Sequence, residues 1–590
     1  RAKRRRSRLR LNRKQRAGDS FPMNTYASLA GPVLAAFPQL SAADLVFAPA
    51  PKLDMADVAL RTFEPARKLG IPPPELAKRI VAEVTFGKDV RELSVAGPYV
   101  NFKLDRSVFG RSIVDAILAE GKRYGSNASG KGKRALVEHT SINPNASPHV
   151  GRARNAMIGD SVVRLLRFEN YDVEVHYYVN DIGRQIALLV LACENPETLT
   201  FDQMLDIYAQ ANARSEEDSA FAEAGFELLA KIEQGDESVK KKFYAVTELC
   251  LKGQLAVLAR LGIHYDRFDR ESDFVKDPRL DKVLDALREK GALFTDEEQR
   301  LSVDLCKIGH PHYPADEGRY VALLRSNGSS MYVYRDVAYT IEKMSKGADL
   351  NLIVLGEDHL MYMQQIALML AAADWGAPEP IYYSYILLKE GKMSTRQGKV
   401  VLLSDFLDEA TARAAERVDE QCADLTPEER KVIAEHVAVA AIRFAILRVS
   451  SNKNVIFDWD SSMSFTGDTG PYVQYSCARI SSILRKLPVT MPDSAPPAFP
   501  VEKNSEWALL SKLATYPETV ASAVAQRSVA PVAQFALETA RLFTTFYHEC
   551  PVRDAPSDEQ RVARGLICVA TRTTITNALD LLGVTALERM

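Results

Sequence analysis

The sequence predicts a multidomain α/β protein, in which a parallel β-sheet is followed by an all-helical region. Four apolar, β-rich runs alternate with helical patterns in the middle of the chain, at residues 134–142, 172–180, 350–355 and 380–388. This alternation is typical of a Rossmann-type parallel sheet. From about residue 411 the apolar spacing is helical almost throughout. The length of 590 residues allows about three or four domains.

The first 22 residues differ sharply in charge from the rest. They carry a net charge of +9, so the remaining 568 residues carry −11 within the overall net charge of −2. Such an arm could bind nucleic acid or act as a transit peptide. We interpret residues 1–22 instead as a basic leader that is disordered or not native sequence, because Met23 precedes the first segment able to fold.

Residues 23–125 are expected to form an α+β domain. Residues 63–84 contain two helical patterns joined by a Pro-rich turn, and residues 95–104 (VAGPYVNFKL) read as one strand. A flexible, basic linker follows at 125–134.

The α/β domain is assigned to residues 126–410 and the helical domain to 411–590. A charged helical stretch at about 186–270 is too long for a loop and predicts a helical insertion. The helical domain contains one further strand run, at residues 455–457.

The segment HTSINPNASPHVGRARNAMIGD (139–160) carries the strongest chemical signal. It predicts a strand, an Asn- and Pro-rich turn, and a helix over residues 153–167. Free N–H groups and the positive end of the dipole make a helix N-terminus suitable for phosphate. His149 would add a donor, and Gly151 would let a flat ring approach the backbone.

Three more polar segments follow predicted strands. They are YYVNDIGRQI (177–186), VLGEDH (354–359) and the Gly-bounded GKMSTRQGKVV (391–401). Ligands of open parallel sheets bind at the carboxyl ends of the strands, where these segments lie. Each segment is weak evidence alone, but their order along the chain indicates one site.

Taken together, these motifs resemble those of class I aminoacyl-tRNA synthetases. His149-Val150-Gly151-Arg152 is similar to the family's His-Ile-Gly-His motif, and Lys392-Met393-Ser394-Thr395-Arg396 to its Lys-Met-Ser-Lys-Ser loop. The closer resemblance, over about residues 40–590, is to arginyl-tRNA synthetases. It is carried by YYVND and by LGIHYDRFDRES (261–272), MYVYRDVAY (331–339), FTGDTGPYVQYSCARI (465–480), FYHECPV (546–552) and LLGVTALERM (581–590).

The resemblance implies ligation of L-arginine to tRNA(Arg) through an arginyl-adenylate. ATP would enter as its Mg²⁺ complex, and no covalent enzyme nucleophile is needed. The expected catalytic residues are His149, Gly151, Arg152, Lys392, Ser394 and Arg396. The expected ATP-binding residues are Pro148, His149, Gly151, Gly356, Asp358, His359, Lys392 and Met393. For His359, a structural role remains open.

Carboxylates are the natural partners of arginine's planar, charged guanidinium. By position in the family motifs, the expected arginine-binding residues are Asn143, Asn145, Glu271, Tyr332, Asp336 and Tyr362. Asp336 and Glu271 are the candidates for the guanidinium or, in part, the α-amino group. The alternative is that Asp336 pairs with the adjacent Arg335 or another surface cation, and a pair with a cation of the protein is an alternative for Glu271 too.

The resemblance also assigns RNA-binding roles to the outer domains. Residues 23–125 would be an additional tRNA-contacting domain, and 411–590 an anticodon-binding domain. Helical anticodon domains stack bases on aromatic rings and bind phosphates with Arg and Lys. The candidate tRNA-binding residues are Tyr99, Phe102, Tyr472, Tyr475, Arg479 and Tyr547.

Two departures from the family motifs fall on groups that would meet the triphosphate. Arg152 replaces a His, and Thr395 replaces the second Lys of the loop. We hypothesise that Arg152 and Arg396, together with Lys399, restore the missing donors. The alternatives are a class I synthetase for another amino acid, and a paralogue that binds tRNA or arginine without charging.

The remaining expectations come from composition. The seven cysteines are scattered and never spaced as CxxC, which favours a reducing compartment and no bound structural metal. No apolar run approaches the roughly 20 residues of a membrane span. We therefore expect a cytoplasmic protein without a membrane partner, and a monomer.

Overall fold

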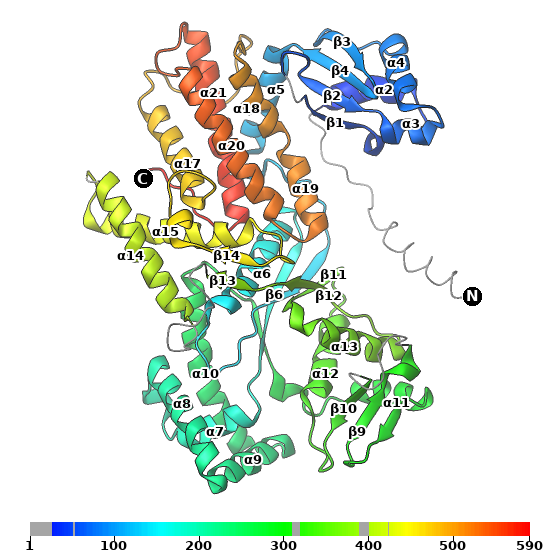
Figure 1. Cartoon of the computed structure of the whole chain (residues 1–590), viewed down its shortest axis with the longest axis vertical. Helices are drawn as coiled ribbons and strands as arrows, with labels where there is room; N and C mark the ends of the chain where they lie inside the picture. Colours follow the sequence, from blue (N-terminus) through cyan, green and yellow to red (C-terminus); the bar gives the residue numbers. More distant parts are fainter. Residues whose placement is uncertain (1–25, 51–52, 310–318, 389–400, 423) are drawn as a thin grey trace.

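The computed structural model describes residues 26–50, 53–309, 319–388, 401–422 and 424–590. The central parallel sheet lies between a helical body on one side and two inserted units on the other (Figure 1). The N-terminal domain projects from the far end of the helical body (Figure 1). Within the described ranges, no helix is both long and apolar enough to span a bilayer. The predicted leader, residues 1–22, lies outside the described residues.

The N-terminal domain is an antiparallel sheet covered by helices. Its strands β1 (Val46–Pro49), β2 (Val58–Arg61), β3 (Val90–Ala96) and β4 (Tyr99–Leu104) pair in the order β1-β2-β4-β3. Helices α2 (Ala27–Ala36), α3 (Phe63–Leu69) and α4 (Pro73–Glu83) complete the domain, and α4 packs on β3 and β4. The two helices expected in residues 63–84 are α3 and α4.

The single strand expected at 95–104 is a hairpin. Ala96 pairs with Tyr99 across a two-residue turn. Gly97 in that turn has φ +58°, a conformation that a side chain would disfavour. Residues 90–96 therefore fold back on 99–104.

The central sheet has five parallel strands in the order β12-β11-β5-β6-β7. These are β5 (Arg134–Glu138), β6 (Asp172–Val179), β7 (Arg267–Arg270), β11 (Leu350–Gly356) and β12 (Glu379–Tyr383). Helix α6 (Val150–Phe168) packs against β5, β6 and β11. The predicted Rossmann-type sheet is confirmed. The segment predicted at 380–388 divides into β12 and β13 (Ile386–Leu388).

Two units are inserted in the chain between strands of the central sheet. The predicted helical insertion contains α7 (Arg184–Ala192), α8 (Phe201–Glu217), α9 (Ser219–Gln234) and α10 (Glu237–Ala259). The second unit was not expected. It contains an antiparallel sheet of β8 (Leu293–Thr295), β9 (Leu301–Asp304) and β10 (Tyr320–Leu324), beside helices α11 (Leu280–Glu289), α12 (Tyr332–Ser345) and α13 (Leu360–Ala372).

The C-terminal region is helical, as expected. Its main helices are α14 (Leu403–Gln421), α15 (Pro427–Leu447), α17 (Gly470–Arg485), α18 (Asn504–Ala514), α19 (Tyr516–Gln526), α20 (Ala530–Glu549) and α21 (Asp558–Leu581). The expected strand at 455–457 is β14 (Val455–Phe457), which pairs with β13. Helix α14 begins before the boundary placed at residue 410. Helix α5 (Arg106–Glu120) packs on α18 and α21, so it lies with the helical body.

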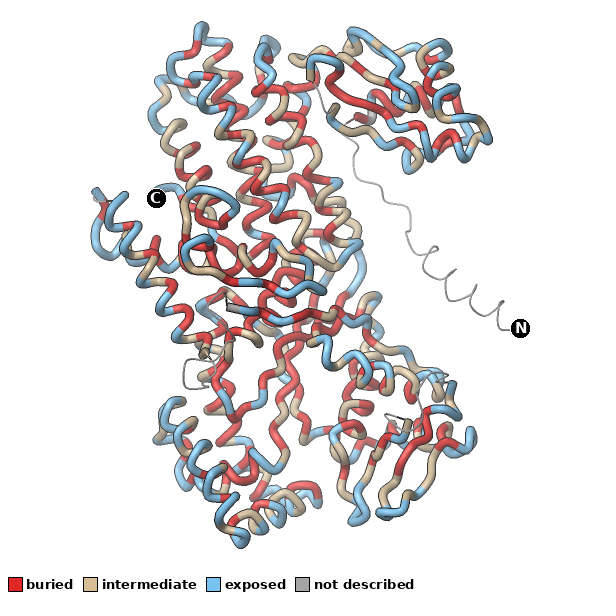
Figure 2. The backbone as a smooth tube through the Cα atoms, viewed as in Figure 1, coloured by how far each residue is buried: buried red, intermediate tan, exposed pale blue. Residues whose placement is uncertain are grey.

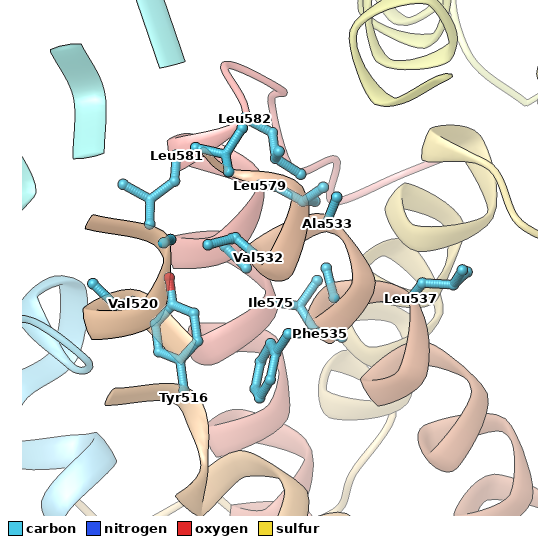
Figure 3. Close-up of a cluster of buried hydrophobic side chains, with 14 of the residues drawn as sticks. Tyr516, Val520, Val532, Ala533, Phe535, Leu537, Ile575, Leu579, Leu581 and Leu582 are labelled. Carbon is cyan, nitrogen blue, oxygen red and sulfur yellow. The ribbon is translucent and has the colours of Figure 1, made fainter. Parts of the chain in front are cut away.

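Buried residues run continuously from the central sheet into the helical body (Figure 2). Tyr516, Phe535, Ile575 and Leu579 are completely buried where α19, α20 and α21 meet (Figure 3). This core gives the sheet a rigid support on the side away from its inserted units.

A buried arginine joins three parts of the chain behind the sheet. Arg443 on α15 pairs with Asp160 on α6 and donates to the carbonyl oxygens of Leu261, at 2.8 Å, and Leu582, at 2.6 Å. Gly583 has φ +65°, and a Cβ there would lie 2.3 Å from the guanidinium carbon. The charged side chain is thus paired with a carboxylate and hydrogen-bonded to two carbonyls, which offsets the cost of burying it.

Candidate active site

The predicted phosphate site is built where α6 begins. Strand β5 ends at Glu138, and His149 is the N-cap residue of α6, with extended backbone. Residues 401–403 lie against this turn. The Val150 N–H donates to the Val401 carbonyl oxygen at 3.2 Å, and the Leu403 N–H to that of Pro148 at 2.8 Å. The segment after the predicted lysine loop therefore meets the start of α6.

Lys392, Met393, Ser394, Thr395, Arg396 and Lys399 lie outside the described residues. The roles given to these residues stay predictions.

A pocket of about 470 Å³ lies at the carboxyl ends of β5, β6 and β11, and α12 and α13 form its other walls. Its polar lining comes from these elements, from the start of α6 and from the turns after β7 and β11: Glu138, Thr140, Ser141, Arg152, Asn155, Tyr178, Asn180, Glu271, Tyr332, Asp336, Tyr339, Thr340, Lys343, His359 and Tyr362. Asn155 holds two walls together, because its side chain accepts from the Thr140 N–H at 2.6 Å and donates to the Val354 carbonyl at 2.8 Å.

Arg152 is the residue of the His-Val-Gly-Arg motif that lines this pocket, whereas Pro148, His149 and Gly151 stand outside its lining. Burial, and next the charge of Arg152, lower the pKa of His149. The imidazole is therefore neutral at pH 7, with one N–H donor.

Three carboxylates line the pocket, and two of them have a cationic partner in the protein. Glu138 pairs with Lys343, and both side chains are buried. Glu271 accepts from Arg335 Nε at 2.7 Å. Asp336 instead accepts from the neutral hydroxyl of Tyr362. The expected alternative, a pair between Asp336 and Arg335, does not form.

The protonation of these carboxylates follows from burial. Burial raises the pKa of Asp336 to about 6, and the Tyr362 hydrogen bond opposes the rise. Burial also raises the pKa of Glu271, where Arg335 opposes the rise. Both groups are more costly to ionise than ordinary carboxyls, and a cation in the pocket would reverse that cost.

Of the predicted arginine-binding residues, Glu271, Tyr332, Asp336 and Tyr362 all line this pocket. Asn143 and Asn145 are not part of its lining. Asn145 is buried and donates to the Gln185 side chain at 2.9 Å, while Asn143 is exposed and its carbonyl accepts from Gln254 at 2.9 Å.

The three residues after β11 that were expected to bind ATP also differ in whether they line the pocket. Gly356 and His359 line the pocket, whereas Asp358 is exposed outside the lining. The Asp358 Oδ1 atom lies 3.2 Å from His359 Nδ1.

Sequence reasoning missed several lining residues, and periodicity could have found some of them. Tyr178 precedes Asn180 by two, so strand alternation places both on one face. On α12, Asp336, Tyr339 and Lys343 follow Tyr332 by four, seven and eleven, which is one helix face. Glu138 ends the strand before the motif turn, a position typical of ligand sites.

The aromatic candidates for RNA binding have different surroundings. The Arg479 guanidinium lies 4.6 Å from the ring centroid of Tyr475 and 5.1 Å from that of Tyr547. Tyr472 is half-buried, and its hydroxyl lies 3.0 Å from Thr544 Oγ1.

Of the N-terminal candidates, Tyr99 is exposed. The prediction for Phe102 is wrong, because that ring is completely buried and cannot stack on a base. The two residues are three apart in β4 and so face opposite sides of the sheet.

Among the described residues, no group of three or more His, Cys, Asp or Glu side chains is arranged to hold a metal ion.

Comparisons with known proteins agree over nearly the whole chain. A family profile described as tRNA synthetases class I (R), catalytic domain, matches residues 113–459. The arginyl tRNA synthetase N-terminal domain matches 27–104, and the DALR anticodon binding domain matches 473–590.

Curated relatives include two archaeal arginine–tRNA ligases. The protein of Methanopyrus kandleri is 36% identical over 567 residues, which cover 92% of this chain and 93% of the relative. That of Methanothermobacter thermautotrophicus is 35% identical over 551 residues, with 92% and 94% covered.

Solved structures show the same architecture. The Thermus thermophilus arginyl-tRNA synthetase superposes with a TM-score of 0.74 at 26% identity, covering 96% of this chain and 100% of that one. The Plasmodium falciparum enzyme gives 0.75 at 19% identity, with 97% and 99% covered. The chain therefore belongs to the arginyl-tRNA synthetase family, within the class I aminoacyl-tRNA synthetases.

Proposed function

We propose that this chain ligates L-arginine to tRNA(Arg) at the expense of ATP. The arginine carboxylate attacks the α-phosphorus of ATP, and the bond to pyrophosphate breaks. A ribose hydroxyl of the tRNA 3′ end then attacks the adenylate carbonyl, and AMP leaves. The observation that carries the assignment is the pairing of carboxylates in the pocket, where Asp336 has a neutral partner and Glu138 and Glu271 have cationic ones.

A guanidinium is the ligand that this arrangement favours. It is always charged, and its fork of N–H donors matches a carboxylate. Asp336 is half-buried in the pocket wall and would pair with it, while Tyr362 holds that carboxylate in place. Tyr332 is exposed and lies beside Tyr362, with ring centroids 5.4 Å apart, so its ring can cover the bound side chain.

ATP would bind between the start of α6 and the turn after β11. The positive end of the α6 dipole would attract the phosphates, and the neutral imidazole of His149 would donate to a phosphate oxygen. Arg152 enters the pocket from the first turn of α6 and would supply positive charge there. Gly356 and His359 offer a backbone edge and a ring to the adenosine. Mg²⁺ would arrive with the nucleotide as its counterion.

Two surfaces would hold the tRNA outside the reaction site. Tyr475, Arg479 and Tyr547 form an aromatic–cation cluster on α17 and α20, suited to stacking an unpaired base. Tyr99 offers an exposed ring on the N-terminal sheet.

The direct test is ATP-dependent charging of total tRNA with each of the twenty amino acids, labelled in turn. The proposal expects only arginine to become acid-precipitable with the tRNA. Charging with another amino acid would identify a synthetase of different specificity. A folded protein that binds tRNA without charging it would be the non-charging paralogue.

A further inference from the structure

Tyr178 lies in the wall of the arginine pocket, one residue from a tyrosine with entirely different surroundings. Both residues belong to β6, where successive side chains point to opposite faces. Tyr178 lines the pocket together with Asn180, two residues further on. Tyr177 points the other way, into the core beside Tyr265.

The ring of Tyr178 is fixed, but its hydroxyl is unused. The ring stacks on that of Tyr339 on α12, with centroids 4.3 Å apart and an interplanar angle of 12°. The side chain is only 5% exposed, and no described residue hydrogen-bonds to its hydroxyl. Buried hydroxyls are normally hydrogen-bonded, so this orphaned group in a pocket wall indicates a partner that enters with a ligand.

The electrostatic surroundings identify the kind of ligand. Burial raises the pKa of Tyr178 well above its usual value, and the negative charges of Asp336 and Glu271 raise it further. The hydroxyl therefore stays protonated at neutral pH beside two carboxylates. A ligand that suits all three groups must be cationic and must carry several N–H donors.

We propose that the Tyr178 hydroxyl oxygen accepts a hydrogen bond from the guanidinium of arginine, and so makes Tyr178 a binding and specificity residue. This inference rests on the proposed function. A guanidinium has five donors, more than a single carboxylate can accept. Asp336 accepts hydrogen bonds from some of the guanidinium N–H groups, and the Tyr178 hydroxyl oxygen accepts one from another. The hydrogen of the Tyr178 hydroxyl then turns toward a carboxylate. Citrulline, whose carbonyl oxygen replaces an N–H donor group, would lose the interaction.

The test compares Tyr178→Phe with Tyr177→Phe, each of which removes one oxygen atom. The Tyr177 hydroxyl accepts from the Ile142 N–H at 3.0 Å and lies 2.9 Å from Gln254 Oε1, so its role is structural. The readouts are KM and kcat for arginine, ATP and tRNA in the charging reaction, and the thermal unfolding midpoint.

For Tyr178→Phe we expect KM for arginine to rise about tenfold, the effect typical of a lost hydrogen bond to a charged group. The values of KM for ATP and tRNA and the unfolding midpoint should stay unchanged. For Tyr177→Phe we expect a lower midpoint with an unchanged KM for arginine.

Two results would overturn the inference. One is an unaltered KM for arginine in Tyr178→Phe. The other is a lowered midpoint in that variant with KM raised equally for all three substrates, which is the signature of a structural role. A wild-type protein that fails to charge arginine would instead refute the proposed function, so the two failures are distinguishable.

Discussion

Which cation the pocket can bind depends on which of its carboxylates is already paired with a cationic side chain of the protein. Glu138 and Glu271 are satisfied by Lys343 and Arg335. Asp336 is left with a neutral hydroxyl donor. Since burying an uncompensated charge is costly, the pKa of Asp336 in the empty pocket is raised to about 6. A bound guanidinium would favour its ionised form.

This linkage predicts a pH dependence for arginine. Because Asp336 must ionise to pair with the guanidinium, kcat/KM for arginine should rise with pH through about 6. Below that pH it should fall by at least tenfold per pH unit, because Glu271, whose pKa burial raises to about 7, lines the same pocket and titrates in the same range. The measurement is the kcat/KM profile for arginine between pH 5 and 8, with tRNA and ATP saturating. A flat profile over this range would contradict the assignment of Asp336.

Arg152 lines the pocket from the first turn of α6. If its guanidinium meets the phosphates, Arg152→Ala should raise KM for ATP by roughly tenfold to a hundredfold, with KM for arginine little changed. Arg260→Ala is a matched control, because Arg260 is exposed and pairs with Asp408.

The double variant Arg152→His, Thr395→Lys restores the family's usual residues at both departures from its motifs, and so tests whether Arg152 and Arg396 replace the missing donors. If it kept the wild-type turnover and KM for ATP, the hypothesis that Arg152 and Arg396 replace the missing donors would fail.

Among the elements, the sequence predicted the strongly periodic ones and missed the short ones. The parallel strands β5, β6 and β11 are apolar runs that stand out from their surroundings. Strand β7 has four residues, and it alternates Arg267 and Asp269 with Phe268 and Arg270. Its partner β6 makes it a strand, which local propensity alone does not show. The small sheet β8-β9-β10 was missed for the same reason.

The same limit applies to the site. Motif positions pointed to Asp336, Tyr332 and Tyr362, and the structure brings these three residues to one pocket. They could not show that Glu271 is already paired with Arg335, sixty-four residues further along the chain. Nor could they show which of Tyr99 and Phe102 is exposed, because alternation puts the two rings on opposite faces of β4 and the packing of the domain decides which face is buried.

The crossing of α15 and α17 makes a prediction about packing. A Cβ added at Gly470 would lie 2.3 Å from the Ala440 carbonyl oxygen and 2.9 Å from Phe444 Cβ. Gly470→Ala should therefore destabilise the helical body by about 1–3 kcal/mol, as overpacking does, and lower the thermal unfolding midpoint. In α2, a Cβ at Gly31 would meet nothing within 4 Å. Gly31→Ala should leave the midpoint unchanged or raise it slightly. Equal midpoints for the two variants would contradict the close crossing.

Across the whole molecule, the two proposed tRNA surfaces belong to different domains. The helical body and the N-terminal domain meet through α5, which follows β4 and packs on α18 and α21. A tRNA that touches both surfaces and the pocket must span most of the protein. Separate contacts of this kind should contribute to binding almost additively.

Tyr547→Ala tests the surface on the helical body. Removing the ring should raise KM for tRNA by about fivefold to a hundredfold, as expected when a base loses the aromatic ring on which it stacks. The KM values for arginine and ATP should stay unchanged. Tyr320→Ala serves as the control, because Tyr320 is also an exposed tyrosine and lies on β10 of the inserted sheet. If both variants affected KM for tRNA alike, or neither did, the assignment of this surface would be wrong.

Asp336 is proposed to select arginine by its charge, and Asp336→Asn removes that charge while keeping the size of the side chain. The exposed Asp273, which pairs with Lys240, gives the matched control Asp273→Asn. We predict that kcat/KM for arginine falls on the order of a hundredfold or more in Asp336→Asn, as for a truncated buried charge pair, while KM for ATP stays within about twofold. Asp273→Asn should behave as the wild type. An Asp336→Asn enzyme that folds and charges arginine with the wild-type kcat/KM would contradict the claim.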